Sequence, residues 1–284
     1  MKYEGCYMAM NDRQSKILHY IENHGSVRTR DLQELCAECT PMTLWRDLEK
    51  LEESGYIHRF HGGASLAYTQ DHEEERPFFS RLNENVTEKE DISLIAVDLL
   101  TPNHALYLDG GSTTYSLARH LPDGHYTIIT SGANIAVELS QRNGFNVNLL
   151  GGQVLGSTLA CSGPQAEDML DSINIDIAVL ATSGFSLENG FACGCLSEAR
   201  LKRHVISKAA SCSIMLMDLD KIGKAHPFTF ATLSDIDIII TNDEPPPAIL
   251  QRMESEHVKI FSPNDGYTSS ERRSWFEDFL ASKR

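Results

Sequence analysis

The stretch TPMTLWRDLEKLEESGYIHRFHGGAS, residues 40–65, joins a helical pattern to a hairpin pattern. Leu44, Leu48 and Leu51 recur at the spacing of one helix face, which predicts a helix that packs this face on a small core. Thr40-Pro41 is a typical helix start, because a proline in the first turn has no N–H group to leave unpaired.

After this helix the pattern becomes that of a β-hairpin. Gly55 is expected to end the helix, and residues 56–60 fit a strand. Gly62-Gly63 then predicts a tight turn, so the hairpin is a candidate wing.

Two further helices are predicted upstream. Ile17, Leu18 and Ile21 recur at helical spacing, and residues 23–25 end that helix. Thr29 is expected to cap the second helix. Three short helices and a wing form the geometry of proteins that place one helix in the major groove of DNA.

The side chains that turn away from the leucine stripe are the candidate DNA contacts. Arginine and lysine can reach phosphates or a guanine edge, and threonine can reach a phosphate or a thymine methyl group. Periodicity alone also fits a helical bundle whose basic residues only solvate its surface, so both interpretations stay open. The candidates on the helix are Thr43, Trp45, Arg46 and Lys50. On the wing, Arg59 and His61 suit the DNA backbone or the minor groove.

Most of the negative charge of the chain lies outside this segment. The whole chain carries a formal net charge of −15, whereas residues 1–65 contain eight Lys and Arg against ten Asp and Glu. A DNA-binding surface would therefore be a local basic face. We expect weak non-specific DNA binding, because that binding depends on phosphate neutralisation.

Length and composition predict a globular protein of two domains. The chain has 284 residues, of which 41% are hydrophobic and 23% charged. The acid-rich segment YTQDHEEERPFFS predicts an exposed linker. We expect a tail at residues 1–10, a DNA-binding domain at 11–67, the linker at 68–80 and an α/β domain at 81–284.

The sequence also favours a cytoplasmic protein without metal or cofactor. No apolar run reaches the ~18 residues of a membrane span, and the first residues lack the apolar centre of a secretory signal. The seven cysteines are scattered and expected to be reduced. Cys36 and Cys39 have a zinc-like spacing but lack a second pair of ligands at the usual distance in sequence.

A strand-to-helix junction in the second domain has the composition of an anion site. The apolar run 105–108 leads into Asp109-Gly110-Gly111-Ser112-Thr113-Thr114, and a helical pattern follows. Backbone N–H groups and the helix dipole at such a junction favour phosphate, and hydroxyl groups add donors. The loop matches neither a P-loop nor G-x-G-x-x-G, so ATP and NAD are not expected. Spacing alone also fits an ordinary turn.

Seven apolar runs separated by helical patterns predict a mainly parallel sheet covered on both faces. The runs are 105–108, 126–131, 147–152, 175–184, 213–218, 235–243 and 258–263. Ligands bind beyond the carboxyl ends of such strands. Besides the loop that starts at Asp109, this rim would hold Ser131, Gly152, Ser183, Gly184, Phe185 and Lys221.

Charged residues near the rim have ordinary explanations as well. Glu198 and Lys202 lie four residues apart on a predicted helix, and such a pair is usually a surface salt bridge. Lys221 suits a cation on the rim but also a solvated turn.

Residues 13–65 resemble the winged helix-turn-helix of the DeoR family of bacterial sugar-metabolism repressors. Where the family motif has the first arginine of R-R-D-L, this chain has Trp45, which offers stacking, one N–H donor and apolar contact instead. This departure bears on operator preference. The resemblance rests on Arg13, Ile17, Gly25, Val27, Leu32, Thr43, Arg46-Asp47-Leu48, Leu51, Gly55, Ile57, Arg59 and His61-Gly62-Gly63-Ala64.

The resemblance continues through the second domain, which is similar to the sensor of that family and to the sugar-phosphate isomerase and CoA-transferase superfamily. It implies a DNA-binding regulator, a repressor in the usual case, that forms a homo-oligomer and responds to a phosphorylated sugar. E-A-x-x-K at 198–202 and D-x-x-K at 218–221 are regular in such sensors. The resemblance therefore implies effector contacts by Glu198, Lys202 and Lys221.

An isomerase-like enzyme fused to a helix-turn-helix is the alternative. Aldose–ketose isomerisation needs a carboxylate base and a donor that polarises the carbonyl, roles that would fall to Glu198 with Lys202 or Lys221. The glycine-rich lysine loop and D-G-A-D stretch of those enzymes are not evident. A catalytic domain also has no need of a DNA-reading helix, so we expect no catalytic residues.

Overall fold

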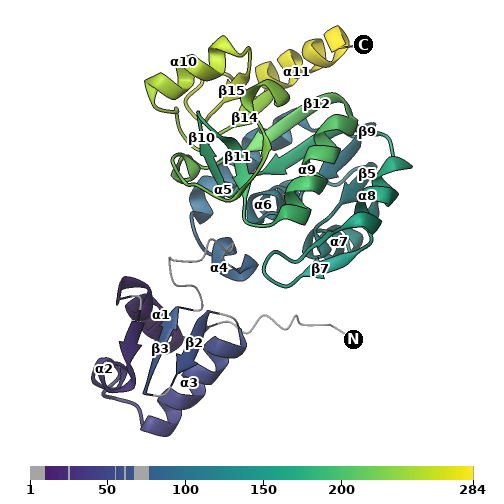
Figure 1. Cartoon of the computed structure of the whole chain (residues 1–284). Helices are drawn as coiled ribbons and strands as arrows, with labels where there is room; N and C mark the ends of the chain where they lie inside the picture. Colours follow the sequence, from purple (N-terminus) through teal and green to yellow (C-terminus); the bar gives the residue numbers. More distant parts are fainter. Residues whose placement is uncertain (1–9, 25, 55, 61, 67–76, 284) are drawn as a thin grey trace. The chain divides into compact units, whose positions relative to one another are not determined.

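The computed structural model describes residues 10–24, 26–54, 56–60, 62–66 and 77–283. The chain divides into two compact units, Met1–Pro77 and Phe78–Arg284 (Figure 1). Among the described residues, no helix has the length and apolar character needed to cross a bilayer.

The described part of the first unit contains three helices and an antiparallel sheet of order β1-β3-β2. This confirms the predicted helices and hairpin. The strand β1, which pairs with β3, was not predicted. The elements are α1 (Asp12–His24), β1 (Ser26–Arg28), α2 (Thr29–Leu35), α3 (Pro41–Glu53), β2 (Ile57–Phe60) and β3 (Gly63–Leu66).

The leucine stripe of α3 forms the centre of the core of this unit. Leu44, Leu48 and Leu51 are all buried, and they belong to one cluster with Ile17 and Ile21 of α1. The predicted apolar faces of α1 and α3 are therefore confirmed, and the opposite face of α3 is left to solvent.

One of the two predicted helix starts is correct. Thr40 caps α3, because its Oγ1 accepts a hydrogen bond from Thr43 N at 3.3 Å. The prediction that Thr29 caps α2 is wrong by one residue. Arg28 is the cap, with extended backbone, and Thr29 is already helical. Thr29 N donates to Gly62 O at 3.0 Å, so the turn of the hairpin fixes where α2 begins.

The second unit is built on a seven-stranded sheet of order β15-β14-β12-β9-β4-β5-β6, in which each neighbouring pair is parallel. Each predicted apolar run contributes one strand, although the boundaries differ by a few residues. The strands are β4 (Ala105–Leu108), β5 (Tyr126–Thr130), β6 (Phe145–Leu149), β9 (Ile175–Ala181), β12 (Ala209–Leu216), β14 (Ile238–Ile240) and β15 (Lys259–Phe261).

Helices cover both faces of this sheet (Figure 1). Leu106 and Leu108 of β4 belong to a buried cluster with residues of α4 (Phe78–Leu82), α5 (Val86–Leu99), α6 (Ser112–His120), α7 (Ala133–Ser140) and α11 (Ser269–Lys283). Tyr107 belongs to the other cluster, with residues of α8 (Pro164–Asp171), α9 (Leu196–Lys208) and α10 (Pro247–Ser255). This alternation is what a strand buried on both faces requires.

The second unit begins earlier than predicted. Helix α4 starts at Phe78, inside the segment 68–80 that we expected to be linker. Phe78 is buried and meets Tyr115 edge-on, with ring centroids 5.6 Å apart. Residues 67–76 lie outside the described part of the chain.

Two small antiparallel sheets lie at the carboxyl ends of the parallel strands. One pairs β7 (Gln153–Leu155) with β8 (Ala160–Ser162), and the other has the order β10 (Gly184–Ser186), β11 (Gly190–Cys193), β13 (Phe228–Ala231). Cys161 N donates to Ser131 O at 2.7 Å, and Ser183 N donates to Ala192 O at 3.1 Å. These contacts place both sheets against the rim where effector residues were predicted. Two short 3-10 turns, η1 (Leu219–Lys221) and η2 (Leu233–Asp235), follow β12 and β13.

Candidate DNA interface and effector rim

The outer face of α3 presents two basic side chains. Arg46 and Lys50 lie one helical turn apart and are both exposed, so phosphates or base edges can reach them. Thr43 is half-buried, and its Oγ1 lies 2.9 Å from Thr40 Oγ1, so its hydroxyl takes part in the helix start. His61, the remaining wing candidate, lies outside the described residues.

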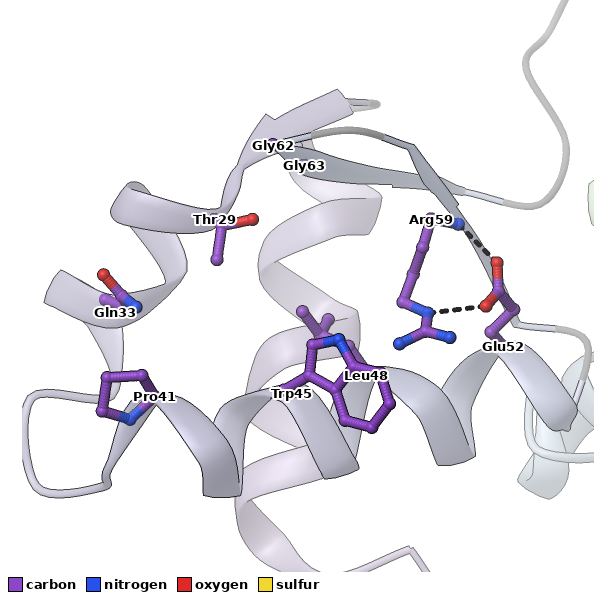
Figure 2. Close-up of a pocket in the computed structure, with 9 residues that line it drawn as sticks. All are labelled: Thr29, Gln33, Pro41, Trp45, Leu48, Glu52, Arg59, Gly62 and Gly63. Atoms are coloured by element: carbon purple, nitrogen blue, oxygen red, sulfur yellow. Dashed lines mark hydrogen bonds and ion pairs between the residues drawn. The ribbon is translucent and has the colours of Figure 1, made fainter.

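Trp45 and Arg59, predicted separately on helix and wing, meet in the structure. Trp45 is 50% exposed, and the Arg59 guanidinium carbon lies 4.9 Å from the centre of its ring. Figure 2 shows the two side chains between α3 and the hairpin. They therefore form one surface rather than two independent contacts.

A buried carboxylate fixes the orientation of α3. Asp47 Oδ2 accepts from Arg13 Nε at 2.6 Å, and Oδ1 accepts from Gln14 Nε2 at 3.0 Å. These bonds join α3 to α1. We did not predict this role, although Arg13 and Asp47 both stand in the motif quoted above.

The loop after β4 is closely packed. Asp109 is buried, and its Oδ2 accepts from Ala181 N at 3.1 Å. A Cβ on Gly110 would lie 2.6 Å from Ala160 Cβ, and one on Gly111 would lie 3.0 Å from Ala181 Cβ. Glycine is therefore needed because β8 and β9 approach the loop backbone.

The hydroxyl groups of this loop differ in availability. Thr114 Oγ1 donates toward Asp109 O at 2.6 Å and Gly111 O at 2.8 Å, so it closes the loop rather than facing a ligand. Ser112 and Thr113 are 5% and 6% exposed, which leaves little of either side chain for contact.

Lys202 joins the loop to α9. Its Nζ donates to Asp109 Oδ2 at 2.6 Å and to Ala181 O at 2.7 Å, and it lies 3.0 Å from Glu198 Oε1. The Glu198–Lys202 pair is therefore a buried pair and not the surface salt bridge that spacing favoured. These three partners match the three N–H donors of an ammonium group, so Lys202 holds other residues in place instead of binding a ligand.

The charge of this cluster limits what it can bind. Asp109, Glu198 and Lys202 together carry net negative charge when all three are ionised. Such a group repels phosphate and suits hydroxyl groups, which can donate to carboxylate oxygens. The side chain of Glu198 is 10% exposed against 3% for Asp109, so Glu198 is the member that a ligand reaches first.

Lys221 belongs to a second polar group. Its Nζ lies 3.5 Å from Asp218 Oδ2, and Asn85 Nδ2 donates to Asp218 Oδ1 at 3.3 Å and to Asp220 Oδ2 at 2.9 Å. Lys89 Nζ donates to the main-chain oxygens of Arg81 in α4 and of Glu84 in the α4–α5 connection. Burial, together with the nearby Lys221 ammonium, lowers the pKa of Lys89 to about 8.

Both units match known families. Residues 13–70 match the DeoR-like helix-turn-helix domain, and residues 84–243 match the DeoR C terminal sensor domain. The HTH-type transcriptional regulator YulB of Bacillus subtilis (strain 168) is 32% identical over 253 residues, which cover 89% of this chain and 96% of that relative. The protein belongs to the DeoR family. It is a DNA-binding transcriptional regulator.

More distant similarities extend this comparison. The glycerol-3-phosphate regulon repressor of Escherichia coli (strain K12) is 25% identical over 89% of this DeoR-family chain and 99% of its own. Among solved structures, ribose 5-phosphate isomerase A from Methanocaldococcus jannaschii is 17% identical over 49% of this chain and 55% of its own, with a TM-score of 0.36. A likeness this slight carries no conclusion about activity. The curated relatives are regulators, so the protein is a regulator and not the enzyme of the alternative hypothesis.

Sequence reasoning missed one rim residue of this DeoR-family sensor. The side-chain Oδ1 and Nδ2 of Asn134 are buried, and neither has a hydrogen-bond partner among the described residues. A Cβ on Gly132 would lie 3.0 Å from Asn134 Oδ1 and 3.1 Å from Gly110 Cα, so the amide lies close to the glycine loop. The signal was the position of Asn134 in the first turn of the helix after β5.

Two of four further predicted rim residues serve the packing of the second unit. Phe185 is fully buried and packs against Phe191 with the rings tilted and their centroids 4.6 Å apart, so the expected effector contact is not supported. A Cβ on Gly184 would lie 2.3 Å from Lys224 O, which is a packing requirement. Ser183 is half-buried, and Gly152 is exposed at the start of β7.

Ser131 is the remaining predicted rim residue, and no metal site was expected. Tyr107 OH donates to Ser131 Oγ at 2.9 Å, and burial raises the pKa of Tyr107. Ser131 is thus part of a buried pair beside Asp109. Within the described residues, no group of three or more His, Cys, Asp or Glu side chains is arranged to hold a metal ion.

Proposed function

We propose that this DeoR-family regulator represses genes of carbohydrate use, and that a phosphorylated sugar or related metabolite at the rim of the second unit controls its binding to operator DNA. The buried Asp109–Lys202–Glu198 cluster carries this proposal. It places carboxylate oxygens beside a glycine loop, as recognition of a polyhydroxylated ligand requires.

The phosphate would lie away from the carboxylates. Helix α6 begins after Gly111, which offers no side-chain cap, so the first N–H groups of this helix favour an anion. The buried amide of Asn134, which has no hydrogen-bond partner among the described residues, is a further polar group for the ligand. Lys221 supports the site from the loop after β12.

The name of one relative agrees with this ligand class. The glycerol-3-phosphate regulon repressor is named for a phosphorylated polyol. That metabolite combines hydroxyl groups with a phosphate, which are the two kinds of group that the rim can serve.

On the DNA side we propose that α3 enters the major groove through Arg46 and Lys50, with Thr43 at its start and Arg59 and His61 on the hairpin. Two operator half-sites match a two-fold protein, so a homo-oligomer, dimer or tetramer, is proposed. A cytoplasmic location follows from operator DNA as partner.

The test uses the full chain and DNA upstream of the genes beside its own. Fluorescence anisotropy measures DNA release by a panel of sugar phosphates, each paired with its unphosphorylated sugar, and by inorganic phosphate. One sugar phosphate should release the DNA, whereas its free sugar should not. If no compound in the panel changes the affinity, or if the protein converts one of them, the proposal is wrong.

Variants separate the two halves of the proposal. Arg46→Ala should lose DNA binding and keep the thermal shift caused by the sugar phosphate. Glu198→Gln and Lys221→Ala should keep DNA binding and lose release. Glu188→Gln, at an exposed position, serves as the control and should behave as wild type.

A further inference from the structure

Three side chains of the first unit hold one another, and we call them the Arg59 clamp: Trp45, Glu52 and Arg59. Glu52 Oε1 accepts from the main-chain nitrogen of Arg59 at 2.7 Å, and Oε2 accepts from Arg59 Nε at 2.6 Å. The guanidinium lies over the Trp45 indole, with the carbon 4.9 Å from the ring centroid (Figure 2).

The clamp leaves one edge of the guanidinium for a partner outside the chain. Among the described residues, the hydrogen bonds of Arg59 to protein acceptors use its main-chain nitrogen and Nε. The Nη1–Nη2 edge is therefore available while the plane of the group is fixed. A planar pair of donors with fixed direction is what a two-acceptor partner recognises.

The clamp lies on a concave surface. A hollow of about 640 Å³ is lined by the clamp, by Thr29 and Gln33 of α2, and by the Gly62-Gly63 turn. Figure 2 shows these residues around the space between α2, α3 and the hairpin. The hollow thus borders the helix that the proposed function assigns to DNA.

Charge decides between a phosphate and a base as the partner. Glu52 already balances the charge of Arg59, so the pair is neutral. A phosphate that approached Arg59 would also meet the Glu52 carboxylate and gain little. A guanine edge is uncharged and presents O6 and N7, two acceptors that match an arginine fork.

We propose that the Arg59 clamp reads a guanine edge in the operator, with Glu52 and Trp45 as positioning residues. This inference rests on the proposed assignment of α3 and the hairpin to DNA. Beyond that assignment, the inference names guanine as the base and Glu52 and Trp45 as the residues that orient Arg59.

The experiment selects DNA from a random-sequence library with the full chain and its variants, and then measures the salt dependence of binding. The wild type should recover a guanine at one position of each half-site. Arg59→Lys should lose that preference by about 5- to 150-fold while other positions keep theirs, because lysine lacks the planar pair of donors.

Glu52→Gln tests the positioning role. Without the Glu52 carboxylate, the Arg59 guanidinium should contact a phosphate instead of the base, so the preference for guanine falls. Because one more phosphate is then neutralised, the slope of log K against log salt should steepen by about one unit. Glu49→Gln is the matched control, because it removes the same charge from the same helix without a contact to Arg59 among the described residues. That control should keep the guanine preference.

If Arg59→Lys weakens binding to every sequence alike and Glu52→Gln leaves the salt slope unchanged, Arg59 is a phosphate contact and the inference is wrong. Arg46→Ala distinguishes this failure from failure of the proposed function. Unchanged DNA affinity in that variant would remove α3 from the interface altogether.

Discussion

Lys202 Nζ of α9 lies 2.6 Å from Asp109 Oδ2 at the end of β4, and both side chains are at most 4% exposed. The same ammonium lies 3.0 Å from Glu198 Oε1, so one cation holds two buried carboxylates together. The glycine loop of the rim therefore depends on a residue more than ninety positions away in the sequence.

Removal of this cation should destabilise the second unit. Lys202→Met leaves Asp109 and Glu198 close together and uncompensated, and we expect a loss of about 3–5 kcal/mol in the free energy of unfolding. Urea unfolding of the full chain measures this. Lys224→Met, at an exposed position, should change stability by less than about 0.5 kcal/mol. Equal stability of both variants would contradict the ion-pair interpretation.

Gly110 should tolerate no side chain. A Cβ there would lie 2.6 Å from Ala160 Cβ, so Gly110→Ala must displace β8 from the loop. We expect a loss of about 1–3 kcal/mol. Gly151→Ala is the control, because a Cβ at Gly151 would meet no atom within 4 Å. Thermal unfolding of the two variants should differ clearly, and a shared melting temperature would count against the packing described here.

Lys89 should make stability rise with pH in the alkaline range. Burial and Lys221 lower its pKa from 10.5 to about 8 in the folded chain. Below pH 8 both folded and unfolded chains hold this proton. Between the two values only the unfolded chain holds it, so the free energy of unfolding increases with pH across that window, by at most about 3 kcal/mol. Above the upper value no further change is expected from this group.

The measurement for Lys89 compares wild type with Lys89→Met by urea unfolding at both ends of the window. Every other titratable group is common to both proteins, so the difference between their stabilities is the relevant quantity. Wild type should gain stability relative to the variant as pH rises. A parallel response would mean that Lys89 keeps an ordinary pKa.

Trp45→Arg restores the residue that the DeoR motif has at this position. The new cation would stand beside Arg59 in place of the ring that supports it. We expect the slope of log K against log salt for non-specific DNA to steepen by about one unit, because one more phosphate is neutralised. Titrations at several salt concentrations test this, with Trp45→Phe as the variant that keeps a ring and should keep the wild-type slope.

Local patterns predicted the framework of both units. The leucine spacing of α3 and the seven apolar runs of the sheet depend on periodicity and burial, which neighbouring residues express directly. The start of α3 at Thr40-Pro41 was also local in origin.

Contacts between distant segments could not be predicted in this way. The cap of α2 moved to Arg28 because Thr29 N bonds to the hairpin turn. The Glu198–Lys202 pair is buried because the loop at Asp109 comes to it from another strand. The contact between the Trp45 ring and the Arg59 guanidinium likewise forms only when the hairpin folds against α3.

Asn85 precedes α5 in a left-handed backbone conformation and donates to Asp218, which precedes η1, and to Asp220 within η1, the turn that also carries Lys221. A rim cation that leaves Asp218 for a ligand alters the acceptor on which Asn85 depends. We therefore expect a ligand at the rim to alter the connection between α4 and α5 through Asn85. Hydrogen exchange of the amides in residues 78–86 would register this coupling when a ligand is added.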